Sequence, residues 1–275
     1  MPLPLTLTLR HSLEHRIEMD GVTPDRCAGL GEREIAELPV WEGRRTVPLG
    51  EFFTVHGGHA SSMRVHGGEA LDRVDNMGAG MTAGELVIEG NAGRYAGARM
   101  SGGSLTVRGN AGDGAGLEMA GGRLEITGRA GDRLGAASLG ASRGMLGGEI
   151  VVRGSAGAEA GASARRGLIV IGGDAGERAA NRMIAGSVIV LGNAGADAGL
   201  WSKRGSVVVM GSVEISETYR YDCTYQPLYL RLLFTSLDTR YGIAGSSAYA
   251  AARYRRYSGD MAELGKGEIL HRAEA

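Results

Sequence analysis

The sequence predicts an all-β fold: a right-handed parallel β-helix of about seven coils, with a small α/β region before it and a partly helical tail after it. Three observations lead to this prediction. A glycine pattern recurs at a fixed period, apolar residues alternate after each repeat glycine, and methionines share one repeat position. We expect residues 1–60 to form an N-terminal cap, 61–213 the coils, and 214–275 a tyrosine-rich capping and interface segment.

The repeat unit has the pattern G-x-h-x-h-x-G, where h is apolar, usually followed by N/S/D-A-G. Its steps are 19 residues long except for one of 26, so one repeat carries a seven-residue insertion. Period-two alternation is typical of a strand with one buried face, and so short a unit must stack on its copies to bury that face. Parallel crossovers are almost always right-handed. The repeat glycines are Gly84, Gly103, Gly122, Gly148, Gly167, Gly186 and Gly205.

Two further positions recur in the coils. Asparagine occupies one corner as Asn91, Asn110 and Asn193, where we expect left-handed backbone and side-chain ladders. Methionine lies three residues before a repeat glycine, and we expect these side chains to form a deformable internal stack. The methionines are Met81, Met100, Met119, Met145 and Met183.

The segments before the repeat predict a mixed cap. The alternating LTLTLR is typical of a strand, and residues 23–38 resemble one short helix that Thr23 opens with Pro24 at its first turn. Residues 47–58 predict a second strand. The stretch 61–67 matches the repeat loosely, so we expect it to be a degenerate first coil.

The tail follows Val213, where the repeat stops. Residues 219–257 hold eight of the nine tyrosines, and both LYLRLLF (228–234) and SAYAAARYRRY (247–257) have apolar spacing typical of helices. Tyrosine is common where one surface covers another, so the tail is predicted to cap the coils, to contact other subunits, or both.

One outward strand face becomes apolar over three adjacent coils. A solvated sheet keeps polar side chains on its outer face, so something must cover this patch. We predict an interface here, formed either with the tail or with a partner chain. Its residues are Leu168, Val170, Ile189, Leu191, Val208 and Met210.

The motifs that suggest catalysis are weak. The G-x-S-x-G match around Ser142 lies in the insertion, with neither the strand nor the helix that a nucleophile elbow requires. His56, His59 and His66 lack acidic or thiol partners at metal-binding spacing, so we favour capping or solvated roles. No helix follows the glycine motifs, as a dinucleotide site would require, and GKGE (265–268) lacks the rest of a phosphate loop. We therefore expect no catalytic residue, metal or cofactor in this chain.

Basic residues provide the best candidate site. Arg165 and Arg166 occupy the same repeat positions as Lys203 and Arg204, two coils away, with Arg182 between them. Two tail residues, Arg255 and Arg256, complete the set. We expect a cluster along one edge that binds a polyanion or an acidic partner; a dispersed, solvated set of charges is the alternative.

Bulk properties exclude several classes of protein. The net charge of −1 gives no overall field toward nucleic acid or a membrane surface. No apolar run is long enough to span a bilayer, the N-terminus lacks the features of a secretory signal, and the two cysteines lie far apart. A cytoplasmic protein is expected.

The repeated G-x-h-x-h-x-G-N-A-G coils and the closing segment RYSGDMAELGKGEIL (256–270) resemble the C subunit of formylmethanofuran dehydrogenase over residues 50–267. The coils also resemble the GXGXG domain of glutamate synthase. Two departures are Ala180 at a corner glycine and Val213 at a corner alanine.

The resemblance implies a non-catalytic β-helix subunit in a hetero-oligomer. Its expected partners are amidohydrolase-like, molybdopterin-type-fold and formyltransferase-like subunits, which act on the formyl group of a methanofuran-like carrier with a polyglutamate tail. The arginine-rich, lysine-poor composition favours the bacterial formyltransferase/hydrolase form. The alternatives are a redox dehydrogenase, a glutamate-synthase-like structural module and an independent enzyme.

Overall fold

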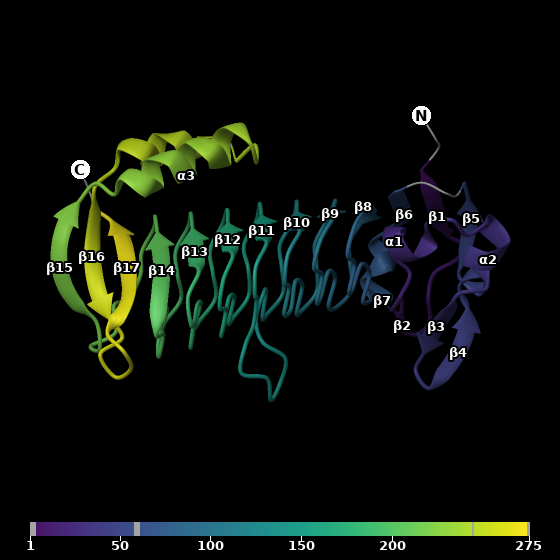
Figure 1. Cartoon of the computed structure of the whole chain (residues 1–275), viewed down its shortest axis with the longest axis horizontal. Coiled ribbons are helices and arrows are strands. Elements are labelled where there is room, and N and C mark those ends of the chain that lie inside the picture. The colour runs from purple at the N-terminus through teal and green to yellow at the C-terminus, as the bar shows by residue number, and fades with distance from the viewer. Residues whose placement is uncertain (1–3, 58–60, 244, 274–275) are drawn as a thin grey trace.

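A single 13-stranded sheet runs the length of the molecule in the computed structural model, which describes residues 4–57, 61–243 and 245–273 (Figure 1). Its order is β15-β16-β17-β14-β13-β12-β11-β10-β9-β8-β6-β1-β5, and a separate sheet has the order β4-β3-β2-β7. The repeats supply β8 (Glu85–Gly90), β9 (Ser104–Val107), β10 (Arg123–Ile126), β11 (Glu149–Val152), β12 (Leu168–Ile171), β13 (Ser187–Val190) and β14 (Arg204–Val209). Because consecutive repeats pair in parallel, the predicted β-solenoid is confirmed.

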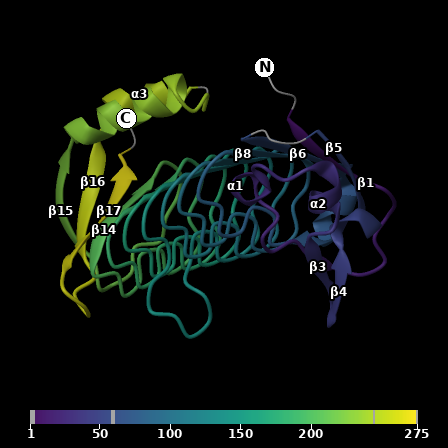
Figure 2. The ribbon, with the colours of Figure 1, turned by 45° about the vertical axis from the view of Figure 1, so that its right-hand side comes forward.

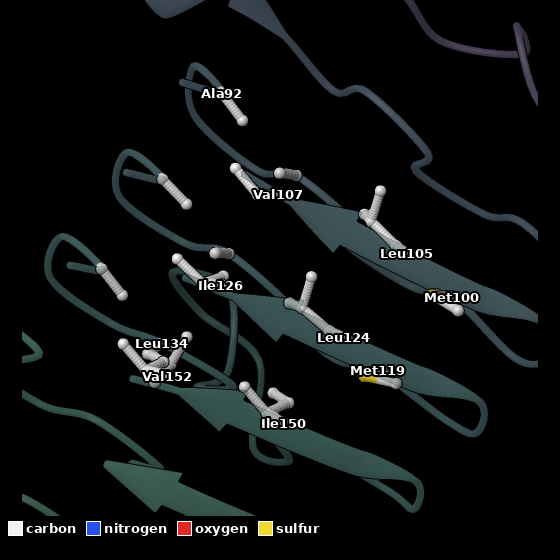
Figure 3. Packing of buried hydrophobic residues seen from close by; sticks show 14 of the residues in the cluster. Ala92, Met100, Leu105, Val107, Met119, Leu124, Ile126, Leu134, Ile150 and Val152 are labelled. Carbon is white, nitrogen blue, oxygen red and sulfur yellow. The ribbon is translucent and has the colours of Figure 1, made fainter. Parts of the chain in front are cut away.

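The register of the coils follows the repeat. Leu124 lies opposite Leu105 on one side and Ile150 on the other, so the seven-residue insertion leaves the ladder unchanged. A second line of parallel bridges joins equivalent corner alanines, beginning with Ala92 and Ala111. The apolar residues of the inner strand face and the five repeat methionines are buried inside the coils, as predicted (Figure 3).

The corners combine left-handed backbone with close contact between coils. Gly122 has φ of +79°, and a Cβ there would lie 2.7 Å from the carbonyl oxygen of Gly103 in the previous coil. Ala180 adopts the same left-handed geometry at φ of +59° despite its side chain. The corner asparagines do not have positive φ, so that expectation was wrong. Their ladder exists nevertheless, because the amides of Asn110 and Arg129 donate to Asn91 Oδ1 and Asn110 Oδ1.

The N-terminal cap is continuous with the coils. The strand β1 (Leu5–Leu9) pairs with β5 (Phe53–His56) and β6 (Ser62–Gly68). β6 pairs in parallel with β8, with a register shift between His66 and Gly68, which confirms the degenerate first coil. The small sheet comprises β2 (Ile17–Glu18), β3 (Pro39–Glu42), β4 (Arg45–Pro48) and β7 (Val74–Asp75). The single helix predicted over 23–38 is two, α1 (Pro24–Cys27) and α2 (Glu32–Ala36), because Gly29 turns left-handed between them.

The tail contains β15 (Arg220–Tyr225), α3 (Leu228–Thr239), the 3₁₀ helix η3 (Ser246–Ala251), β16 (Tyr254–Gly259) and β17 (Lys266–Arg272). The helix predicted over 228–234 is confirmed within α3. The one predicted over 247–257 is confirmed as helical only for 247–251, which lie in the 3₁₀ helix η3, and is wrong for 254–257, which form the first part of β16. The ladder also continues beyond Val213, since Ile269 of β17 lies opposite Val207 of β14. Gly267 and Ile269 keep the glycine-to-apolar spacing that could have revealed this.

The apolar outward face is covered by the tail, which lies across the C-terminal strands (Figure 2). Val170, Ile189, Val208 and Met210 are buried in one cluster with Leu230, Phe234 and Leu237 of α3, and Leu168 and Leu191 pack against it. The six residues therefore form an interface with the chain's own tail. The tail thus covers Val170, Ile189, Val208 and Met210 completely, while Leu168 and Leu191 stay partly exposed at its margin.

Candidate functional site

Five of the predicted basic residues lie along the edge where the coil strands begin. Arg165 and Arg166 lie just before β12. Arg182 lies in the next coil, before β13, and Lys203 immediately precedes Arg204, the first residue of β14. All five are exposed. Parallel strands are about 4.8 Å apart, so two coils place Arg165 and Lys203 roughly 10 Å apart along the stack. We call these five residues the basic edge.

The charges of the basic edge are uncompensated. In the part of the chain that the structure describes, none of the five has an ion-pair partner. Other coil arginines are paired: Arg64 with Glu89 at 2.9 Å and Arg153 with Glu125 at 2.7 Å. Uncompensated cations on one edge attract carboxylates or phosphates.

A cavity of about 440 Å³ adjoins the basic edge. It lies between the insertion, here defined as the loop 138–144, and the turn 260–265 that joins β16 to β17; both project beyond the same end of the strands (Figure 1). The guanidinium carbon of Arg182 lies 4.9 Å from the centre of the Trp201 ring. The cavity lining comprises Ala141, Ser142, Ser163, Arg182, Ile184, Trp201, Lys203 and Glu263.

The two tail arginines do not join the basic edge, so the predicted single cluster is wrong in this respect. Arg255 lies opposite His271, which itself lies opposite Val209, so it is at the far end of β14 from Arg204. Arg256 is neutralised within the sheet by Glu268 at 2.9 Å and Asp222 at 3.4 Å. The antiparallel hairpin of β16 and β17 separates them from the edge, and sequence spacing alone did not reveal this hairpin.

Arg255 instead lines a pocket of about 890 Å³ with two arginines that the sequence interpretation missed, Arg253 and Arg272. Arg253 donates to the carbonyl oxygen of Thr224 at 3.2 Å, and Arg272 lies over the ring of Tyr249. Arg253 immediately precedes β16 in extended chain, and the alternation of side chains along such a segment is the signal that could have placed it beside Arg255.

The weak catalytic motifs gain no support. Ser142 lies in the loop 138–144 without an adjoining strand or helix. His56 ends β5, His66 lies in β6, and His59 lies outside the described residues. Among the residues with described positions, no group of three His, Cys, Asp or Glu side chains could hold a metal ion. Burial raises the pKa of the Cys27 thiol to about 11, which disfavours the nucleophilic thiolate.

None of the helices in the described part of the chain combines the length and the apolar character that a membrane span requires.

No family model matches the chain. Two curated relatives align with parts of it. One is the C subunit of molybdenum-containing formylmethanofuran dehydrogenase 1 from Methanosarcina barkeri, 40% identical over 31% of this chain and 30% of that protein. The other is the C subunit of the formyltransferase/hydrolase complex of Methylorubrum extorquens, 38% identical over 32% of this chain and 33% of that protein. The aligned part thus spans about a third of each relative.

A solved structure matches over a much greater length. It is the X-ray crystal structure of the formyltransferase/hydrolase complex FhcABCD from Methylorubrum extorquens with methylofuran. One of its chains is 36% identical to this one, with a TM-score of 0.90 over 98% of this chain and 100% of that chain. From this full-length likeness and the named relatives, we conclude that the chain belongs to the family of C subunits of formylmethanofuran dehydrogenases and formyltransferase/hydrolase complexes.

Proposed function

We propose that this protein is the non-catalytic C subunit of a formyltransferase/hydrolase complex, which transfers and hydrolyses the formyl group of a methanofuran-like carrier. The observation that carries the proposal is the full-length similarity to a chain of a complex solved with methylofuran. The proposed partners are amidohydrolase-like, molybdopterin-type-fold and formyltransferase-like subunits. We also propose a cytoplasmic location, where the free thiols of Cys27 and Cys223 would remain reduced.

The architecture suits a scaffold. Each coil contacts its neighbours through two lines of parallel bridges, and both ends carry additional strands that extend the sheet. Stacked coils of this kind form long, stiff surfaces on which several partners can bind side by side.

Co-purification tests membership in the complex. The tagged chain, expressed in its native host and purified gently, is expected to retain an amidohydrolase-like and a formyltransferase-like chain in fixed ratio. A chain that purifies alone and monodisperse would contradict the proposal and favour a structural module of the glutamate-synthase type.

A redox dehydrogenase is the second candidate, because the matched relatives include molybdenum- and tungsten-containing enzymes. Metal analysis of the purified complex separates the two functions. Molybdenum or tungsten in the molybdopterin-type partner would indicate a dehydrogenase, and a metal-free partner a hydrolase.

We further propose that the basic edge guides the polyglutamate tail of the carrier, since its uncompensated cations match a chain of carboxylates. Changing Arg165, Arg166, Lys203 and Arg204 to glutamate should raise the KM for the carrier at least tenfold. A matched control changes four exposed arginines elsewhere to glutamate, namely Arg44, Arg45, Arg129 and Arg231. An equal KM in both variants would refute carrier guidance.

A further inference from the structure

The pocket of about 890 Å³ in the tail, here called the arginine pocket, has an unbalanced charge. Its lining contains three arginines, Arg253, Arg255 and Arg272, and the other lining residues are one threonine and three alanines. The cavity beside the basic edge differs, because Glu263 lies in the same lining as its cations. Cations gathered around one cavity repel each other unless an anion lies among them. The arginine pocket therefore favours a negatively charged ligand.

Paired strands hold these arginines at one end of the tail sheet, where β15, β16 and β17 lie side by side (Figure 1). Arg255 of β16 lies opposite Thr224 of β15, and Arg272 is the last residue of β17. The amide of Ala273 donates to the carbonyl oxygen of Arg253 at 2.9 Å, so the segments before β16 and after β17 are joined. The pocket thus has a frame of hydrogen-bonded backbone.

Two of the guanidinium groups are oriented by their neighbours. Arg253 donates to the carbonyl oxygen of Thr224 at 3.2 Å, and the guanidinium carbon of Arg272 lies 5.4 Å from the centre of the Tyr249 ring. Within the described residues, none of the three arginines has an ion-pair partner, and the bond to Thr224 is the one hydrogen bond that their side chains donate. Since each guanidinium carries five N–H donors, most of these donors are available to a ligand.

The lining indicates the chemistry of the ligand. The planar guanidinium group matches two oxygens of a carboxylate or a phosphate, and several such groups favour a ligand with more than one anionic group. The uncharged lining side chains are small, so the pocket offers little apolar surface to the anchor side chain of a protein partner. Its volume lies in the range of small-molecule sites.

We propose that the arginine pocket binds a small polyanion, either a phosphate compound or a di- or tricarboxylate, through Arg253, Arg255 and Arg272. The bound ligand connects β16 and β17, and it thereby stabilises the tail that covers the apolar outward face. This site is separate from the basic edge, because Arg255 lies at the far end of β14 from Arg204. The inference goes beyond the proposed function and does not depend on it.

Calorimetric titration of the purified full chain with inorganic pyrophosphate and with citrate tests the site. At least one of the two probes should bind, and the stronger one identifies the ligand as a phosphate or a carboxylate. Arg255→Gln should raise the Kd of that probe at least tenfold, because it removes a charged, bidentate donor. The matched control is Arg220→Gln, since Arg220 of β15 is also exposed and lies outside the pocket lining. It should keep the wild-type Kd, and equal Kd values for the two variants would overturn the proposal.

Thermal melting shows whether the variants fold and whether the ligand stabilises the tail. Without a probe, both variants should melt at the wild-type temperature because the changed side chains are exposed. A probe at a hundredfold excess over its Kd should raise the melting temperature of the wild type and of Arg220→Gln by about 5 °C. Arg255→Gln should gain much less at the same concentration. An equal gain in all three proteins would contradict binding in this pocket.

Three further outcomes would overturn the proposal. The first is a wild-type chain that binds neither probe. The second is binding to the isolated chain but not to the intact complex, which would mean that a partner subunit fills the pocket. The third concerns Glu274, which follows Ala273 in the sequence and lies outside the described residues. Binding by Glu274→Gln but not by the wild type would assign the pocket to the chain's own carboxylate. The co-purification that tests the proposed function is independent of all three.

Discussion

At the scale of single residues, the repeat glycines satisfy two demands at once. Their φ values are left-handed, and the coil below leaves no space for a side chain. Sequence periodicity predicted both demands, because a glycine that recurs at every coil marks a close approach as well as a turn. Non-glycine residues such as Ala180 and Trp201 also adopt positive φ. Residue type alone could not identify these positions, because their positive φ is imposed by the stacking of neighbouring coils.

Gly122→Ala tests the close approach. A Cβ at Gly122 meets the Gly103 carbonyl oxygen at 2.7 Å, whereas one at Gly43, with φ of +60°, meets no atom within 4 Å. Gly43→Ala should lower the free energy of unfolding by about 1 kcal/mol through backbone strain. Gly122→Ala should lower it by a further ~1–3 kcal/mol through overpacking. Urea denaturation measures both, and equal losses would contradict the contact.

Arg129→Asn tests the corner ladder. The side chains of Asn110 and Ser155 accept amide hydrogen bonds from the next coils, but Arg129 between them has no acceptor to offer. Asparagine there should accept from the Ser155 amide and raise the free energy of unfolding by about 0.5–1.5 kcal/mol. Arg129→Leu, which also removes the charge but adds no acceptor, is the control and should not stabilise the protein by that amount.

At the scale of elements, the outward apolar face shows what patterning reveals and what it leaves open. The residues of the patch were identifiable from alternation alone, but the identity of the cover was not. A helix such as α3 and a partner chain bury the same atoms with the same driving force. Residues 254–257 were misassigned as helix for a related reason. The exposed edge of β14 recruits the hairpin of β16 and β17, and this tertiary pairing overrides the local helical pattern.

Phe234→Ala tests how strongly the tail holds this face. Phe234 is fully buried between α3 and the sheet, so its removal should cost about 3–5 kcal/mol of unfolding free energy. Leu232, on the same helix, is 70% exposed, and Leu232→Ala should change that free energy by less than about 0.5 kcal/mol. Chemical denaturation with a dye that binds apolar surface would report both effects. Similar losses for the two variants would contradict the packing described.

At the scale of the whole molecule, the solenoid was predictable because each coil repeats the same pattern of glycines and apolar residues. The candidate site was predictable only in part. Equivalent repeat positions brought Arg165, Arg166, Lys203 and Arg204 to one edge. The cavity beside them depends on the loop 138–144 and the turn 260–265, which meet only after the tail has folded back. The repeat pattern contains no signal that the loop and the turn lie close together.

The tyrosines of the C-terminal end predict alkaline sensitivity of the whole fold. Burial raises the pKa of Tyr219 and Tyr241 to about 12, above an ordinary value near 10. The unfolded chain therefore loses these protons at lower pH than the folded one, and the free energy of unfolding should fall between pH 10 and 12. Tyr219, which donates to Gly199 at 2.8 Å, should account for about 2–3 kcal/mol.

Urea denaturation at pH 9, 10 and 11 measures this dependence. Tyr219→Phe has no hydroxyl to ionise, so its stability should fall less steeply with pH than that of the wild type. Parallel pH profiles for the two proteins would exclude Tyr219 as a source of the effect.

The strand order at the C-terminal end has a consequence for biosynthesis. β17 adds directly to β14, although 56 residues separate Val209 from Lys266 in the chain. While those residues are still being translated, the coils already made end in a bare, β-rich edge that can pair with another nascent chain. We therefore expect ribosome-bound or truncated chains that stop before residue 266 to be aggregation-prone and to depend on chaperones, a hazard that ends when the last strand is released.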